Sequence, residues 1–158
     1  MEIVLARIDD RLLHGQVVTV WTRATDCQRI IVCDDEVAKD TVRAMLLTTL
    51  APPGTLAHVM GVEETVRACR DPNYGNDRCI LLFENPASVL RLVELGVDIP
   101  SVNIGSMSFR KGRRRLTAAV SVDEEDISAF RALAKRGVEL EVRRVDTDEK
   151  RMLMEMLQ

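Results

Sequence analysis

Short apolar clusters rich in β-branched residues recur along the chain, and segments with apolar positions three or four residues apart separate them. The clusters are typical of buried strands, and the longer spacing is typical of amphipathic helices. The clusters predict seven strands, at residues 3–8, 29–33, 56–60, 79–83, 102–104, 117–120 and 139–142. The segments predict six helices, at residues 16–24, 39–50, 62–69, 87–95, 124–136 and 148–157.

The alternation of strands and helices predicts an α/β fold, with an open, mainly parallel, doubly wound sheet of about seven strands and helices on both faces. In such a sheet the loops that follow the strands meet at one edge, where ligands bind. We therefore expect residues 9–14, 34–35, 83–86 and 105–108 to share one rim. No repeat, low-complexity segment or long linker divides the 158 residues, so we expect a single domain, 1–158.

Capping signals support some of these boundaries. Ser121 with Glu124 fits a capping box at the start of one helix. Gly96 and Gly137 fit the left-handed stops at the ends of two helices.

Composition narrows the class of protein. Apolar residues make up 46% of the chain and aromatic residues 3%, so the core must be aliphatic. The net charge of −3 gives no global attraction to nucleic acid, and no apolar run approaches the roughly 20 residues of a membrane span. With no signal-peptide pattern either, we expect a cytoplasmic protein with four reduced cysteines. No cysteine pair has zinc-site spacing, so we expect no metal.

The most suggestive stretch is Arg-Ile-Asp-Asp-Arg-Leu-Leu-His-Gly-Gln, residues 7–16, between a predicted strand and a predicted helix. His14 can act as a nucleophile toward phosphorus through a ring nitrogen, and Arg11 can hold two phosphate oxygens. The backbone amides of Gly15 and Gln16, at a helix start, add positive potential. Alternatively, the charged residues form a surface ion-pair cluster that caps the helix, with His14 incidental. Spacing alone leaves both interpretations open.

Other polar side chains are expected at the same rim. A carboxylate of Asp9, Asp10 or Asp34 could orient His14 or Arg11, although it would repel a bound phosphate. Asp34 and Asp35 could equally cap the following segment. The hydroxyl groups of Ser106 and Ser108 could donate to phosphate oxygens, or belong to an ordinary polar turn.

Residues 110–115 contain five cations in six positions. No aromatic residues are interleaved with them as a stacking platform would require, which disfavours nucleic-acid binding. They form either a basic lip for an acidic or phosphate-bearing partner or a solvated charged loop. We expect His58, Trp21 and the C-terminal methionines to be packing residues, the last being Met152, Met154 and Met156.

The run at residues 7–17 resembles the IIB component of the mannose/fructose/sorbose family of the bacterial phosphoenolpyruvate-dependent sugar phosphotransferase system. The resemblance continues through residues 34–40, 51–54, 82–86, 103–108 and 119–123, and so covers nearly the whole chain. Leu13 stands where isoleucine is frequent in the family, and Ser106 where a second glycine is common.

The resemblance implies a protein-Nπ-phosphohistidine–sugar phosphotransferase without a cofactor. His14 would accept phosphate on Nδ1 from a phosphohistidine of a IIA protein and pass it to a hexose or amino sugar imported through the IIC and IID membrane components. Arg11 matches the family's phosphate-stabilising arginine. The resemblance further implies a homodimer that associates peripherally with the permease, as one separate piece of the complex.

Two alternatives belong to other classes. A strand followed by Asp9 and Asp10, with a second strand ending at Asp34, also suits a receiver-like regulatory module that carries phosphate on aspartate. A non-catalytic subunit would instead bind a partner through the basic lip.

Overall fold

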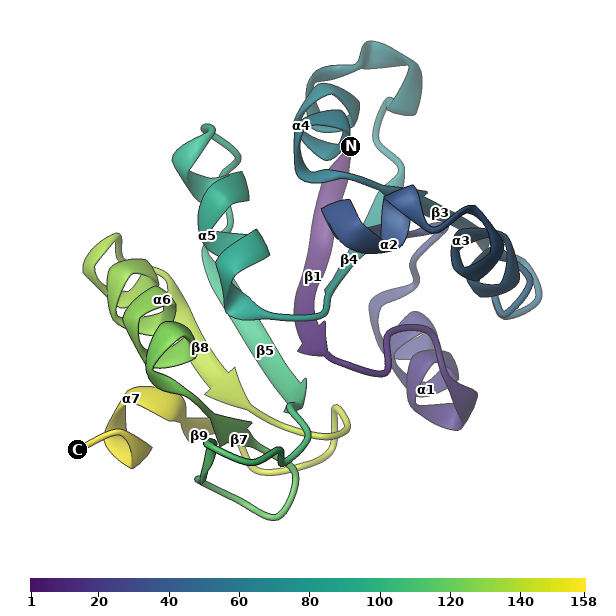
Figure 1. Cartoon of the computed structure of the whole chain (residues 1–158). Helices are drawn as coiled ribbons and strands as arrows, with labels where there is room; N and C mark the ends of the chain where they lie inside the picture. Colours follow the sequence, from purple (N-terminus) through teal and green to yellow (C-terminus); the bar gives the residue numbers. More distant parts are fainter.

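The structure, a computed structural model, describes the backbone of residues 1–158 and every side chain except those of Gln16 and Val17. Its main sheet has seven strands in the order β3-β2-β4-β1-β5-β8-β9 (Figure 1), of which only the last pair, β8 with β9, is antiparallel. The strands are β1 (Glu2–Asp9), β2 (Arg29–Cys33), β3 (Leu56–Met60), β4 (Arg78–Phe83), β5 (Ser101–Ser106), β8 (Glu139–Val142) and β9 (Arg151–Met152).

Helices cover both faces of this sheet, in two apolar layers. One layer joins the sheet to buried residues of α4, α5, α6 and α7, and the other joins it to residues of α1, α2 and α3. The bounds are α1 (Gly15–Thr25), α2 (Asp35–Lys39), α3 (Thr41–Thr48), α4 (Val62–Arg70), α5 (Pro86–Glu94), α6 (Glu124–Lys135) and α7 (Leu153–Met156), with a 3₁₀ turn η1 (Pro72–Tyr74). The predicted doubly wound α/β fold is confirmed.

The first strand, β1, lies in the middle of the sheet between β4 and β5. Ile8 is aligned with Phe83 on one side and with Ile104 on the other, and all three are fully buried. This apolar packing holds the carboxyl end of β1 in a fixed position, where the register shifts and Asp9 pairs with Ser106.

The predicted strand at residues 117–120 is wrong as a strand of the main sheet. The Thr117 hydroxyl accepts hydrogen bonds from the amides of Ala119 and Val120, both at 3.1 Å, and so closes a local turn. A separate two-stranded antiparallel hairpin, β6 (Arg114–Arg115) with β7 (Ser121–Val122), brackets that turn.

The seventh strand of the main sheet comes instead from the predicted helix at residues 148–157, and this prediction is also wrong in part. The Asp148 carboxylate accepts from the amides of Arg144 and Val145, and the chain then returns beside β8, with Arg151 aligned with Val142. Helical structure begins only at Leu153. Tertiary pairing here overrides the local helical pattern.

Two helix starts also differ from prediction. The helix predicted at residues 39–50 is α3, which begins two residues later because Asp40, in an extended conformation, caps it; Asp40 also ends the short helix α2, which was not predicted. The capping box of α6 is formed by Asp123 and Asp126 rather than by Ser121 and Glu124. The stops at Gly96 and Gly137 are confirmed by φ angles of +99° and +83°.

All four cysteines are free thiols, as expected. Within the part of the chain that the structure describes, no helix is both long and apolar enough to cross a membrane.

Candidate functional site

The four loops expected at one rim do lie together. The Asp10 carboxylate accepts from the Ser108 amide at 2.7 Å and from the Ser106 hydroxyl at 3.4 Å, which joins the loop after β1 to the loop after β5. Arg43 of α3 lies 3.7 Å from Glu84, in the loop after β4. Burial raises the pKa of Glu84, Asp34 and Asp10 add to the rise, and Arg43 and Arg110 oppose it. Glu84 therefore lies within electrostatic reach of groups from all parts of the rim.

The loop that carries His14 is held by apolar anchors. Leu12 and Leu13 are buried beneath α1, and the Leu12 amide donates to the Asp9 carbonyl at 2.8 Å. Leu12 adopts φ +58°, a left-handed conformation that bulky residues rarely adopt. His14 follows as the extended residue that begins α1, and its side chain is 23% exposed. The anchored loop thus presents His14 at the surface.

The imidazole of His14 is paired with Asp9. Nε2 lies 3.0 Å from Oδ2 of Asp9, a carboxylate that is only 1% exposed. An ionised carboxylate can only accept a hydrogen bond, so Nε2 carries the proton in this pair. The lone pair of a neutral imidazole is then on Nδ1, which is the nitrogen available for nucleophilic attack.

Arg11 lies beside this pair. Oδ1 of Asp9 accepts from the Arg11 amide at 3.1 Å and from Nε at 3.4 Å, while the side chain of Arg11 is 51% exposed. Its guanidinium can therefore hold a phosphate at the surface and remain tethered to the histidine loop. The first turn of α1 adds the positive end of a helix dipole, and Gly15, at φ +44°, allows the sharp entry.

Arg7, by contrast, lies inside the protein. It is 2% exposed and donates to Oδ2 of Asp9 at 3.2 Å, to the Arg143 carbonyl at 3.1 Å and to the Asn103 side chain. Burial lowers the pKa of Arg7, and the neighbouring Asp9 opposes that change. The interpretation of residues 7–11 as a wholly surface ion-pair cluster is therefore wrong, because the first arginine is in the core.

The buried charges continue to a second ion pair. The Asn103 amide donates to Oε1 of Glu141 at 3.1 Å, and Arg143 donates to both oxygens of Glu141 at 2.9 Å. Apart from the half-exposed Arg11, the network contains two cations, Arg7 and Arg143, and two anions, Asp9 and Glu141. Asp9 consequently faces His14 as part of a neutral assembly, which reduces its repulsion of a phosphate at Nδ1.

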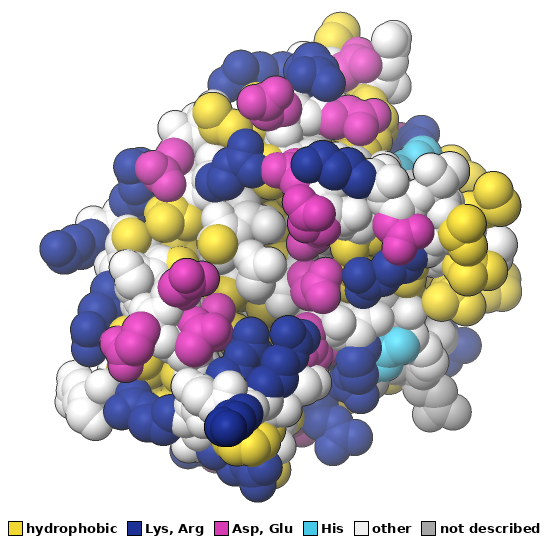
Figure 2. All heavy atoms as spheres, in the orientation of Figure 1, with side chains coloured by type: hydrophobic (Ala, Val, Ile, Leu, Met, Phe, Trp, Pro, Cys, Tyr) yellow, Lys and Arg dark blue, Asp and Glu magenta, His cyan; other side chains and the backbone are white. Residues whose placement is uncertain are grey.

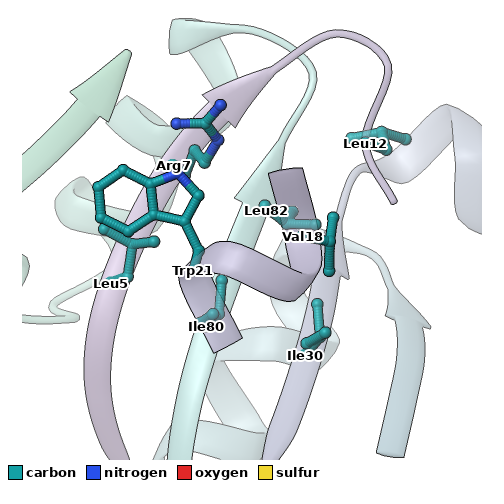
Figure 3. A pocket seen from close by; sticks show the side chains of 8 residues that line it. All are labelled: Leu5, Arg7, Leu12, Val18, Trp21, Ile30, Ile80 and Leu82. Carbon is teal, nitrogen blue, oxygen red and sulfur yellow. The ribbon is translucent and has the colours of Figure 1, made fainter. Parts of the chain in front are cut away.

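Trp21, on α1, packs against the two arginines of this network. Its ring lies 5.4 Å from the Arg7 guanidinium and 5.3 Å from that of Arg143, within cation–π range. Figure 3 shows Arg7 directly beside the indole, at the edge of an apolar cavity of about 10 Å³ beneath α1. That volume is about one water molecule, so the cavity is a packing defect rather than a ligand site. Trp21 is a core residue, as expected.

Gly105 of β5 makes room for Arg7. A Cβ at this position would clash with the Arg7 guanidinium. Because the guanidinium is buried and bonded to three residues, it cannot simply swing away.

The remaining predicted rim residues have separate places. Oδ1 of Asp34 accepts from the amides of Glu36 and Val37 at 2.9 Å, so the structure favours the capping interpretation for Asp34. Asp35 instead accepts from the Val62 amide at 2.8 Å and pairs with Arg91. Both contacts lower the pKa of Asp35. The side chain of Gln16 lies outside the described residues.

Sequence reasoning missed Asn103 and Glu141 altogether. The signal was present, because strands of a parallel sheet covered on both faces are normally continuously apolar. A buried asparagine and a buried glutamate within β5 and β8 break that pattern, and such residues need partners.

His58 lies at the edge of the sheet, on β3, away from this site. Its Nε2 is 3.0 Å from Nη1 of Arg29, and burial together with the Arg29 charge lowers the pKa of His58. Among the residues that the structure describes, no cluster of histidine, cysteine, aspartate and glutamate is arranged to hold a metal.

A histidine with one nitrogen held by a carboxylate, the other free and an arginine beside it can accept and release a phosphoryl group. Residues 3–158 match the family model described as the sorbose subfamily IIB component of the phosphotransferase system (PTS). The chain therefore belongs to the sorbose subfamily of PTS IIB components.

Individual relatives agree with this assignment. The chain is 57% identical over 157 residues to the PTS mannose-specific EIIAB component of Escherichia coli (strain K12), covering 99% of this chain and 49% of the relative. It thus spans about half the length of that relative. It is 49% identical over 148 residues to the PTS sorbose-specific EIIB component of Klebsiella pneumoniae, covering 94% of this chain and 90% of the relative.

Solved structures give the same result for the fold. The IIBSor domain of the sorbose permease from Klebsiella pneumoniae superposes with a TM-score of 0.96 and 46% identity, covering 99% of this chain and 96% of that domain.

Proposed function

We propose that His14 is a transient phosphoryl carrier, which accepts its phosphoryl group on Nδ1 and passes it to a sugar. The observation that carries the proposal is the 3.0 Å contact between Nε2 of His14 and Asp9, because it leaves Nδ1 free and directed away from the buried network. Family membership supports the same chemistry.

In the first transfer, the phosphorus–nitrogen bond of a donor phosphohistidine breaks and a bond from phosphorus to Nδ1 of His14 forms. The donor imidazole keeps the electron pair of the broken bond. Charge on the three equatorial oxygens is stabilised by Arg11 and by the first turn of α1. Asp9 stabilises the positive charge that develops on the His14 ring.

In the second transfer, the bond from phosphorus to Nδ1 breaks and its electron pair stays on the imidazole, while a sugar hydroxyl oxygen bonds to phosphorus and its proton passes to solvent water. The cavity beside the site, beneath α1, has a volume of only about 10 Å³, which is too small for a sugar. The proposal therefore places sugar recognition on the membrane components, with a hexose or amino sugar as substrate. The relatives named for mannose and sorbose support that substrate class.

The proposed donor is a IIA protein or domain, and the name EIIAB of the E. coli relative supports that choice. The proposed acceptors are IIC and IID components, with the protein working at the cytoplasmic face of the membrane as a homodimer. The dimer is tested by light scattering during gel filtration, where a single monomer mass across the micromolar range would contradict it.

The direct test of the phosphoryl carrier is labelling by the phosphotransferase donors, followed by mass mapping of the label. His14→Ala is expected to abolish labelling. The matched control is His58→Ala, which removes the other histidine of the chain and is expected to label like wild type. Equal labelling of His14→Ala and wild type would refute the proposal.

The same experiment separates the alternative of a phosphoaspartate module. A phosphohistidine is lost in acid and survives alkali, whereas an acyl phosphate is cleaved by alkali and hydroxylamine. We expect the acid-labile product, since Asp34 is engaged as a helix cap and Asp9 is paired with Arg7.

A further inference from the structure

The loop of residues 109–115, here called the basic loop, leaves the sheet at the carboxyl end of β5 and returns through β7. It is held at its base, where the Met107 amide donates to the Ala119 carbonyl and the Ser121 amide donates to the Met107 carbonyl. Arg114 and Arg115 form one strand of the hairpin. The basic loop therefore has a defined conformation, because backbone hydrogen bonds fix its base and part of it pairs in a hairpin.

Its five cations divide into two groups. Arg113 is turned inward and only 15% exposed, donating to the Ser108 carbonyl at 3.2 Å and lying 3.8 Å from Asp126. The other four are exposed: Arg110, Lys111, Arg114 and Arg115. Among the described residues none of these four forms a salt bridge with a carboxylate. One cation therefore holds the loop, and four are available to a partner.

An exposed aromatic ring lies among these cations. Phe109 is 56% exposed, and the Arg115 guanidinium lies 5.1 Å from its ring centre. Figure 2 shows Lys and Arg side chains gathered at the lower end of the molecule, with a hydrophobic side chain among them. Cations around a single exposed apolar group are typical of a surface that enters the headgroup region of a bilayer.

The basic loop belongs to the same rim as His14. Ser108, next to Phe109, donates its amide to Asp10 of the histidine loop at 2.7 Å, and Arg110 acts on the pKa of Glu84. In Figure 1 the loop between β5 and β7 lies at the end of the molecule toward which β1 and β5 point. A flat surface bound to the basic loop would therefore face the rim.

We propose that the basic loop is a docking surface for an anionic lipid bilayer, which it binds through four cations and Phe109, turning the His14 rim toward the membrane. The orientation rests on the proposed function, because a phosphoryl group destined for an imported sugar must be delivered there. The binding does not rest on it.

The observations favour lipid over an acidic protein surface. With a net charge of −3, the chain as a whole is repelled by an anionic bilayer, so attraction must come from a local cluster. Four cations near a membrane surface supply such attraction without defined partners. The single exposed ring of Phe109 is less than the apolar centre that protein interfaces usually bury, but it can enter the headgroup region of a bilayer.

The test is flotation of the full chain with vesicles of neutral phosphatidylcholine or of phosphatidylcholine with a quarter phosphatidylglycerol. Binding to the anionic vesicles only is expected, with loss of binding at high salt. Each cation contributes about fivefold in affinity, so replacing Arg110, Lys111, Arg114 and Arg115 by glutamine should weaken binding by on the order of a hundredfold or more. Phe109→Ser should weaken it by about tenfold.

The matched control removes the same charge elsewhere, by replacing the exposed helix residues Arg23, Arg67, Arg131 and Lys135 with glutamine. It is expected to bind within threefold of wild type. Equal loss in both quadruple variants, no binding by wild type, or equal binding to neutral vesicles would overturn the inference.

A second measurement separates this inference from the proposed function. The basic-loop variant should accept phosphate from a soluble donor at the wild-type rate, and His14→Ala should bind vesicles like wild type. Unchanged vesicle binding with slow labelling of the basic-loop variant would assign the loop to the donor protein and overturn lipid docking. Vesicle binding by a wild-type protein that cannot be labelled would refute the phosphoryl carrier alone.

Discussion

Asp9→Asn replaces a buried carboxylate with an amide of the same shape, so its effects come from the lost negative charge rather than from a change in packing. The substitution leaves the buried Arg7 without the carboxylate that bonds to it at 3.2 Å. Removing one member of a buried ion pair costs about 3–5 kcal/mol. We expect a cost near the lower value, because Arg7 keeps a second anion nearby in Glu141, to which Asn103 connects it. At about 2–4 °C per kcal/mol for a chain of this size, Tm should fall by about 6–12 °C.

The same substitution should also slow phosphoryl transfer, for a reason that is independent of stability. An asparagine can donate or accept toward Nε2 of His14, so the ring loses its preference for the tautomer with a free Nδ1. We expect the single-turnover rate of phosphoryl transfer to fall by at least about tenfold at a temperature where the variant is folded.

The assays are thermal unfolding followed by circular dichroism and rapid-quench transfer from a labelled donor. Asp10→Asn is the matched control, because this neighbouring carboxylate binds Ser108 rather than His14. If Asp9→Asn unfolded within 2 °C of wild type and transferred phosphate within about twofold of its rate, the inferred roles of the buried carboxylate would be refuted.

Three further predictions concern Arg11, Gly105 and His58. Arg11→Ala should slow phosphoryl transfer by at least about tenfold yet cost at most about 1 kcal/mol of stability, because the Arg11 side chain in the ion pair with Asp9 is half exposed. Arg11→Lys should restore only part of the rate. A large drop in the Tm of Arg11→Ala would show a structural role instead. Gly105→Ala should destabilise the fold by about 1–3 kcal/mol in urea titration, because the new methyl group displaces the buried Arg7 guanidinium; unchanged stability would show that the guanidinium can move. The pKa of His58 is lowered in the folded protein, so as pH falls the unfolded chain binds a proton there first, and stability decreases below about pH 6.5. His58→Gln should therefore flatten the dependence of stability on pH between about pH 7 and 5. An unchanged slope would contradict the lowered pKa of His58.

The fold was predictable wherever local pattern and tertiary structure agree. Parallel strands buried on both faces, such as β2 and β4, are continuous apolar runs, and five of the six predicted helices lie within two residues of the observed ones. The misses occurred where a long-range contact decides the outcome. Residues 148–152 have a helical pattern, yet pairing of Arg151 with Val142 makes that segment the edge of the sheet.

The position of the candidate site could be predicted from the sequence, but most of its hydrogen bonds and ion pairs could not. A strand-to-helix turn in a parallel sheet predicted that His14 lies at the rim. Arg7 falls inside the predicted strand at residues 3–8 and Arg11 in the loop after it, but the strand pattern does not show what Arg7 would bond to. Arg7 is buried because its partners are Asn103 and the Arg143 carbonyl, about one hundred residues away or more, and because Gly105 leaves space for it.

Nitrogen-15 and phosphorus-31 NMR of the intact phosphorylated protein identifies the ring nitrogen of His14 that carries the phosphoryl group. We expect one phosphohistidine, at His14, with phosphorus coupled to Nδ1 and a proton retained on Nε2 facing Asp9. Phosphorus bonded to Nε2, or a phosphoryl group on a carboxylate, would contradict it.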